Sequence, residues 1–155
     1  MIKRKKLFDE VLKEYEVVPH PEYNGLKSEK VSEVLNIPLE YVVKCLIVKV
    51  LKGTEEYIAC IISGDRRLSI GKLSKTINVP KKKLRLALPK EIETLGYSIG
   101  CIPPTITIEK HVEGCVDMEV LKLPFIIASA GEKFYGIKFN PTILLNIGYK
   151  PAILT

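Results

Sequence analysis

Apolar residues fill nearly every position of Val42–Val48, and β-branched residues are frequent among them. The run does not alternate between apolar and polar positions, which predicts a strand covered on both faces. Gly53 and Thr54 then lead into a second strand-like run, Tyr57–Ile62, so the pattern predicts a β-hairpin. We expect the rest of the chain to be organised around the first of these strands.

The remaining periodicity predicts helices and strands that follow one another without strict βαβ alternation. Helical spacing of apolar residues favours helices at residues 2–15, 28–35, 69–77, 89–95 and 142–147. A loop is expected at residues 21–25, and extended runs occupy residues 16–20, 84–88, 105–108, 115–121, 125–129 and 134–139, while residues 149–154 close the chain. This mixture predicts an α+β fold: a single domain over residues 1–155, with a mixed, largely antiparallel and curved β-sheet flanked by helices.

Two segments of the chain resemble each other, Val31–Pro38 and Leu73–Pro80. In each, a predicted helix ends at an Asn, a residue that tolerates the left-handed conformation, and a Pro two residues later opens the next turn. A strand-like run follows in both cases. The pattern predicts a repeated helix–turn–strand unit, although one such pair does not establish duplication.

Composition narrows the class of protein. The chain has 155 residues, of which 46% are hydrophobic, and this is enough to bury a sizeable core without disulfides. Its net charge of +6 suits a polyanionic partner, nucleic acid above all, and Lys3–Lys6, Lys81–Lys83 and Arg85 are candidate phosphate contacts. The sequence shows neither an apolar run as long as a membrane span nor a signal peptide, so we expect a cytoplasmic protein without a membrane partner.

The four cysteines show no C-x-x-C spacing, and His20 and His111 are the only histidines. A zinc site would need paired ligands at short spacing. We therefore expect no metal, no other cofactor and no structural disulfide.

Lys44 is the exception within the first strand, because it places an ammonium group in an apolar run with no carboxylate within three residues on either side. One interpretation is that its stem lies on the core while its charged end reaches solvent. The other is that it points into a cleft and meets an anion, such as a phosphate or a developing oxyanion. The sequence leaves both open.

Two further stretches are candidates for binding through the backbone. Residues 96–104 combine two glycines and two prolines with buried-type residues, which produces a rigid loop that exposes amides and carbonyls. Ser129-Ala130-Gly131 forms a corner of small residues between two predicted strands.

Together these stretches resemble the YbaK/prolyl-tRNA-synthetase-associated editing domain family over nearly the whole chain. The resemblance rests on the lysine within Val43–Val48, on Gly96-Tyr97 leading into Gly100–Pro104, and on Ile127–Gly131. Gly100–Pro104 matches the G-x-x-x-P loop of that family. No one of these motifs is strong alone, but their order and spacing are specific.

The resemblance implies a trans-acting aminoacyl-tRNA deacylase, which hydrolyses the ester of mischarged tRNA. Lys44, Gly100 and Pro104 fall at the family's catalytic positions. The substrate-binding residues that it implies are His20, Cys45, Cys101, Ile102, Pro103, Ser129, Ala130 and Gly131. The expected partner is the acceptor end of mischarged tRNA, with an aminoacyl-tRNA synthetase as a further candidate.

This sequence departs from the family at a few positions. Bacterial cysteinyl-tRNA deacylases of the family tend to carry a tyrosine and an aspartate where this chain has Val18 and Gly136, and a threonine often follows the lysine where this chain has Cys45. The departures leave the lysine and the loop intact, so they bear on amino-acid specificity.

Two other functions stay open at this stage. One is a non-catalytic module that binds tRNA or a synthetase, which the basic surface would serve equally well. The other is hydrolysis of a small nucleotide ester. Hydrolysis of a labile aminoacyl ester needs only a positioned water and oxyanion stabilisation, which fits a sequence without a Ser-His-Asp set.

Overall fold

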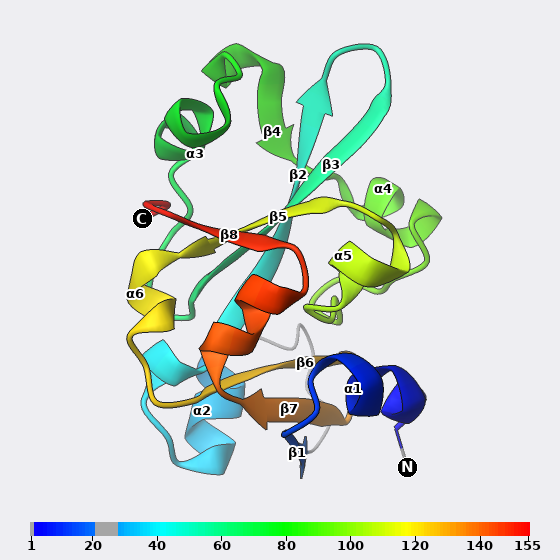
Figure 1. The fold of residues 1–155 in the computed structure, drawn as a ribbon, viewed down its shortest axis with the longest axis vertical. Helices are drawn as coiled ribbons and strands as arrows, with labels where there is room; N and C mark the ends of the chain where they lie inside the picture. The colour runs from blue at the N-terminus through cyan, green and yellow to red at the C-terminus, as the bar shows by residue number, and fades with distance from the viewer. Residues whose placement is uncertain (1, 21–27) are drawn as a thin grey trace.

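A computed structural model describes residues 2–20 and 28–155, so the loop expected at residues 21–25 lies outside the described residues. The strands form a five-stranded sheet in the order β4-β2-β3-β5-β8 and a three-stranded sheet in the order β1-β7-β6 (Figure 1). Their bounds are β1 Glu16–Pro19, β2 Val43–Leu51, β3 Glu55–Ser63, β4 Leu84–Leu86, β5 Glu113–Asp117, β6 Ile126–Glu132, β7 Tyr135–Phe139 and β8 Tyr149–Ala152.

The predicted hairpin and the α+β class are confirmed. β2 pairs antiparallel with β3 along its whole length, while β5 and β8 add to the sheet in parallel, so the sheet is mixed. One hydrophobic cluster, which includes Ile47 and Ile61, covers one face of the hairpin, and a second, which includes Val48 and Leu73, covers the other. Burial on both faces explains why β2 lacks polar alternation.

Short helices surround the sheets. Their bounds are α1 Lys5–Val11, α2 Ser28–Leu35, α3 Ile70–Ile77, α4 Pro89–Thr94, α5 Ile106–Glu109 and α6 Met118–Leu121, with 3₁₀ helices η1 Leu39–Tyr41, η2 Lys81–Lys83 and η3 Pro141–Asn146. None of the helices within the described residues is long and apolar enough to cross a membrane.

Three predicted elements differ from the structure. Residues 105–108 were expected as a strand but form α5, because the turn after Pro103-Pro104 begins a helix in which the Glu109 amide donates to the Thr105 carbonyl. The strand expected at residues 115–121 ends at Asp117, where α6 begins. The first helix ends at Val11, and Lys13 then takes a left-handed conformation with φ of 64°.

The repeated helix–turn–strand unit is confirmed in its geometry. Asn36 and Asn78 both adopt left-handed conformations, with φ of 53° and 57°. The Ser32 hydroxyl donates to the carbonyl of Ile37 at 2.6 Å, and the equivalent hydroxyl of Ser74 donates to the carbonyl of Val79 at 2.6 Å. Each unit continues through a 3₁₀ turn into a strand, and these two strands, β2 and β4, are antiparallel neighbours.

The two sheets meet beside one end of β2. Val42 forms a parallel bridge with Ile127 of β6, whereas β4 pairs with β2 only at Val48–Val50. The Ala87 amide, just beyond β4, donates to the Ile47 carbonyl at 2.8 Å. The edge of β2 between these two attachments is therefore left in a gap between β4 and β6.

Candidate functional site

A cavity of about 570 Å³ occupies this gap. Its walls come from β2, α2, the end of β4 and its connection into α4, the loop before α5, and strands β6 and β7, with His20 after β1. The volume falls within the range of roughly 300–1,000 Å³ that is usual for small-molecule sites. Most of the lining is apolar, and a few polar groups converge on it.

The structure brings the three sequence motifs to one cavity. Lys44, Gly100 and Ser129 lie on different elements, yet all three line it. The further predicted residues on the lining are His20, Cys45 and Ile102. The predicted residues that are not part of the lining are Cys101, Pro103, Pro104, Ala130 and Gly131.

Lys44 lies at the edge of the cavity and is half-buried. Its Nζ donates a hydrogen bond of 2.7 Å to the carbonyl of Arg66, in the turn that follows β3. A lysine ammonium has three donors, so this bond fixes the position of the charge while other donors stay available to an anion. The arrangement combines parts of both interpretations of Lys44: the charge reaches the surface, and the surface it reaches is the mouth of a cavity.

Cys45 presents its backbone amide and carbonyl, rather than a reactive thiolate, to the cavity. Burial raises the pKa of its thiol to about 12, despite a hydrogen bond with the Tyr149 hydroxyl that lowers it, so the sulfur is protonated at neutral pH. The Ile47 carbonyl faces the β4 edge, and groups two residues apart on a strand face the same edge. The amide and carbonyl of Cys45 therefore point into the gap that holds the cavity.

The loop Gly100–Pro104 lines the cavity at Gly100 and Ile102, whereas Pro104 is not part of the lining. Gly100 is exposed and has φ of 77°, a left-handed conformation that favours glycine. The Pro104 carbonyl accepts a hydrogen bond of 2.6 Å from the buried Tyr149 hydroxyl, which also contacts the Cys45 thiol. Pro104 is thus tied through Tyr149 to the strand that carries Lys44.

The small-residue corner is a β-bulge. Ser129 pairs with Gly136 and Glu132 pairs with Tyr135, so Ala130 and Gly131 are extra residues in β6. The Gly131 amide donates to the Ser129 hydroxyl oxygen at 3.0 Å, which fixes this oxygen on the cavity wall. Bulges of this kind often re-aim a side chain beside a site.

A polar network behind the cavity was not predicted from the sequence. Arg4 Nε donates to both carboxylate oxygens of Glu109, at 3.2 and 3.0 Å, and Arg4 Nη1 reaches the Gly131 carbonyl at 3.5 Å. Thr105 and Tyr97 also donate to Glu109, at 2.6 and 2.9 Å. Burial by itself would raise the pKa of Glu109, but these hydrogen bonds outweigh it and hold the pKa below its ordinary value.

This network joins the segment after the Gly100–Pro104 loop and the bulge of β6 to the residue that precedes α1. Glu109 belongs to α5, directly after the Gly100–Pro104 loop, and Gly131 belongs to the bulge. Its φ of 85° favours glycine at position 131, and a Cβ there would lie 2.3 Å from Arg4 Nη1, so the Arg4 side chain would have to shift. In the sequence Arg4 is one of four adjacent basic residues, and nothing in the pattern distinguishes it.

A second ionic cluster supports the wall formed by α4. The Glu91 carboxylate accepts hydrogen bonds from Arg85 and Lys49, both at 2.7 Å, and from the Leu88 amide at 2.8 Å. The Arg85 contact is the largest of the effects that lower the pKa of Glu91. The cluster joins β2 and β4 to the start of α4, next to the cavity residues Pro89 and Ile92.

Two of the three departures from the family pattern are neighbours in space. Val18 of β1 and Gly136 of β7 are direct cross-strand partners, and Gly136 also pairs with Ser129 on its other side. A Cβ at position 136 would lie 3.1 Å from Cγ2 of Ile127 and 3.2 Å from the Ala128 carbonyl. The two changes therefore belong to one row of the sheet beside the cavity.

The fold and the cavity define an α+β domain with a small-molecule-sized site between its two sheets. A family profile described as the aminoacyl-tRNA editing domain matches residues 22–144. The chain therefore belongs to the aminoacyl-tRNA editing domain family, as the sequence motifs had indicated.

Relatives among characterised proteins are proline–tRNA ligases. The enzyme of Sulfurihydrogenibium sp. (strain YO3AOP1) is 34% identical over 133 residues, covering 84% of this chain and 22% of the ligase. That of Thermotoga sp. (strain RQ2) is 37% identical over 131 residues, covering 83% of this chain and 21% of the ligase. The chain thus spans about a fifth of the length of these relatives.

Solved structures show the same fold. One is the crystal structure of a proposed trans-editing enzyme for prolyl tRNA synthetase, with a TM-score of 0.79, 23% identity, and coverage of 100% of this chain and 98% of that one. Another, of a hypothetical protein, has a TM-score of 0.83 at 20% identity and covers 99% of this chain and 100% of that one. Both match along nearly their full length.

Proposed function

We propose that this protein is a trans-acting aminoacyl-tRNA deacylase, which hydrolyses the ester between an amino acid and the terminal ribose of a mischarged tRNA. The observation that carries the proposal is the convergence of Lys44, Gly100 and Ser129 on one cavity from three separate elements. Membership of the editing-domain family supports it. The likeness of its fold to the solved structure of a proposed trans-editing enzyme for prolyl tRNA synthetase supports action in trans.

The chemistry proposed for the site is direct attack by water on the ester carbonyl. Because the Cys45 thiol is protonated at neutral pH, this thiol does not supply a nucleophile. The developing oxyanion would be stabilised by donors already in place at the cavity, namely the Cys45 amide and the ammonium of Lys44. The proton taken from water finally reaches the ribose oxygen that leaves.

The remaining lining would position the substrate. The Ser129 hydroxyl oxygen is held by the Gly131 amide, so its own O–H is available to a carbonyl or another acceptor on the substrate. Gly100 lets the loop backbone approach closely without a side chain. Fixing an already labile ester in this way is sufficient for large accelerations, because positioning removes much of the entropic barrier.

The test is a panel of mischarged tRNAs incubated with the protein, with release of each amino acid followed over time. We expect release from at least one member of the panel, and we expect the correctly charged tRNAs to be spared. Hydrolysis of none of them would refute the proposal.

A second candidate is a non-catalytic tRNA- or synthetase-binding module of the same fold. It is favoured by the cross-strand pair of Val18 and Gly136, because both residues differ from the family pattern and Gly136 pairs with Ser129. The same panel separates the two functions, since a binding module would retain mischarged tRNA in a filter-binding assay without freeing amino acid.

A further inference from the structure

The positive charge of this protein is concentrated in one continuous segment, residues 66–83. The segment holds seven basic residues and no acidic one, whereas the whole chain has 24 basic and 18 acidic residues. The rest of the chain therefore carries 17 basic and 18 acidic residues, a net charge of −1. The basic residues of the segment are Arg66, Arg67, Lys72, Lys75 and Lys81–Lys83.

These charges are exposed and are not neutralised. All seven side chains lie at the surface, and within residues 2–20 and 28–155 none of them takes part in an ion pair. Within residues 2–20 and 28–155, one side-chain hydrogen bond involves this group, from Lys72 Nζ to the main-chain oxygen of Thr155. By contrast, Arg4, Lys5 and Arg85 are paired with Glu109, Asp9 and Glu91.

The segment is joined at both of its ends to elements that line the cavity, while its own residues lie outside the lining. At its start the Arg66 carbonyl accepts the hydrogen bond from Lys44, which lines the cavity. At its end η2 leads directly into β4, and Leu86 and Ala87 of that strand and its continuation line the cavity wall. Between these points the chain forms α3, which covers the outer face of the hairpin through Leu73 (Figure 1).

We propose that residues 66–83 form the surface that binds the phosphate backbone of the RNA whose 3′ end enters the cavity. This inference rests on the proposed function and assigns it a docking surface. A basic segment that is joined at both ends to cavity-lining elements would hold the phosphates of nucleotides that follow the 3′ end away from the cavity. Contacts of this kind bind any sequence and depend strongly on salt.

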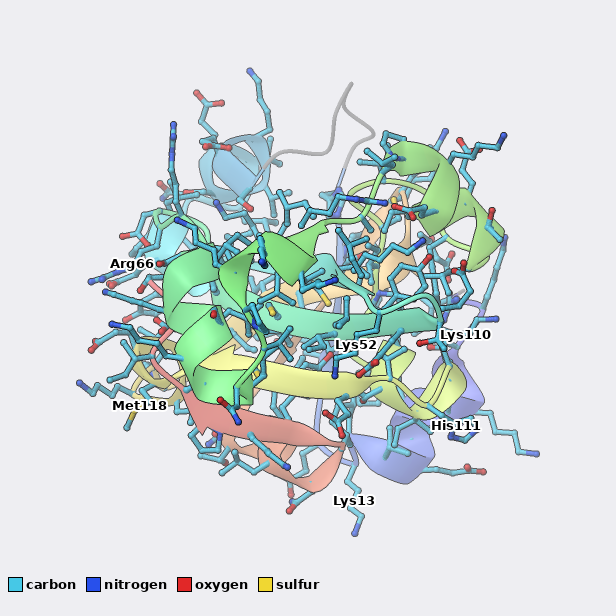
Figure 2. The ribbon with its side chains drawn as sticks, turned by 90° about the horizontal axis from the view of Figure 1, so that it is seen from above. Lys13, Lys52, Arg66, Lys110, His111 and Met118 are labelled. Carbon is cyan, nitrogen blue, oxygen red and sulfur yellow. The ribbon has the colours of Figure 1, made fainter. Side chains whose placement is uncertain are left out.

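The test compares two triple variants with the same change in net charge. The segment variant is Lys81→Gln/Lys82→Gln/Lys83→Gln. The control variant is Lys6→Gln/Lys13→Gln/Lys150→Gln, whose lysines are equally exposed but lie outside the segment. Figure 2 shows that Lys13 lies far from Arg66 at the start of the segment.

The first measurement is the affinity of each protein, at several salt concentrations, for an RNA hairpin that carries no amino acid. The hairpin has a tRNA acceptor stem and a single-stranded 3′ end. Each lost phosphate contact should lower the slope of log affinity against log salt by about 0.7–0.9, so the slope of the segment variant should fall by roughly 2. At 0.1 M salt its affinity should fall by about tenfold to a hundredfold. The control variant should stay within about threefold of wild type.

The second measurement uses 3′-aminoacyl-adenosine, which lacks the stem phosphates. The segment variant should hydrolyse this small ester at the wild-type rate while losing kcat/KM on intact aminoacyl-tRNA. Equal losses of RNA binding in the two variants, or no loss in the segment variant, would overturn the inference. The hairpin assay measures binding and requires no hydrolysis. A wild-type protein without deacylase activity would therefore refute the proposed function, while the hairpin assay would still test the docking surface.

Discussion

Removing the Arg4 side chain should destabilise the protein and loosen the Gly100–Pro104 loop and the bulge of β6. In Arg4→Ala the Glu109 carboxylate keeps its bonds from Thr105 and Tyr97 but loses its cationic partner and the link to Gly131. Breaking a fully buried ion pair by removing one partner costs about 3–5 kcal/mol. The two side chains here are 21% and 18% exposed, so solvent screening reduces the expected cost to about 2 kcal/mol.

The assay for this prediction is thermal unfolding as a function of pH. A loss of about 2 kcal/mol corresponds to a fall in Tm of roughly 4–8 °C for a chain of this size. In the wild type the pKa of Glu109 is lowered on folding, so this carboxylate contributes stability above its unfolded pKa and loses it as pH falls through its folded pKa. Removing Arg4 removes two of the effects that lower this pKa, so the folded-state pKa of Glu109 should be higher than in the wild type, and the deficit should be largest at neutral pH and shrink in acid.

Lys5→Ala is the matched control, because its ion pair with Asp9 in the same helix is exposed and should contribute little. A Tm of Arg4→Ala equal to that of Lys5→Ala at pH 7, or a deficit that grows in acid, would refute the reasoning about the network.

Three further changes probe the cavity and its supports. Gly100→Val should lower deacylation by at least about tenfold with little loss of stability, since a β-branched side chain at φ of 77° distorts the exposed loop; unchanged kinetics would make the loop a mere connector. Tyr149→Phe should cost about 1–2 kcal/mol in chemical denaturation, because the Pro104 carbonyl loses its 2.6 Å donor; an unaltered midpoint would contradict this. Gly136→Asp should lower Tm, because a Cβ there lies 3.1 Å from Cγ2 of Ile127 and 3.2 Å from the Ala128 carbonyl. Adding Val18→Tyr should not restore the Tm, and a restored Tm would show that the two positions are coupled.

The hairpin and the repeated units could be predicted from sequence because their signals are local. The unbroken apolar run of β2 and the Asn–x–Pro turns at positions 36–38 and 78–80 each specify a conformation within a few residues. Residues 105–108 misled the prediction because Thr and Ile favour strands, whereas the neighbouring prolines and the Thr105–Glu109 bonds stabilise a helix.

Local signals indicated the cavity residues that are unusual in their own segments, and the family resemblance added others such as Cys45 and Ile102. Lys44 and Gly100 stand out locally, and both line the cavity. Arg4, Glu109 and Tyr149 act through partners that are tens of residues away in the chain, so no local pattern reveals them. The concentration of charge in residues 66–83 is visible in the sequence, but the contact of this segment with the cavity residue Lys44 requires the fold.

Single-turnover deacylation by Lys44→Ala tests the central claim most directly. The substrate is the mischarged tRNA that the wild-type protein hydrolyses fastest. A charge-assisted contact is worth roughly 1.5–3 kcal/mol, so the rate constant should fall by about one to two orders of magnitude while the thermal stability changes little. Lys44→Arg should recover the rate only in part, because arginine keeps the charge but not the shape. A stable Lys44→Ala protein with the wild-type rate constant would contradict the account.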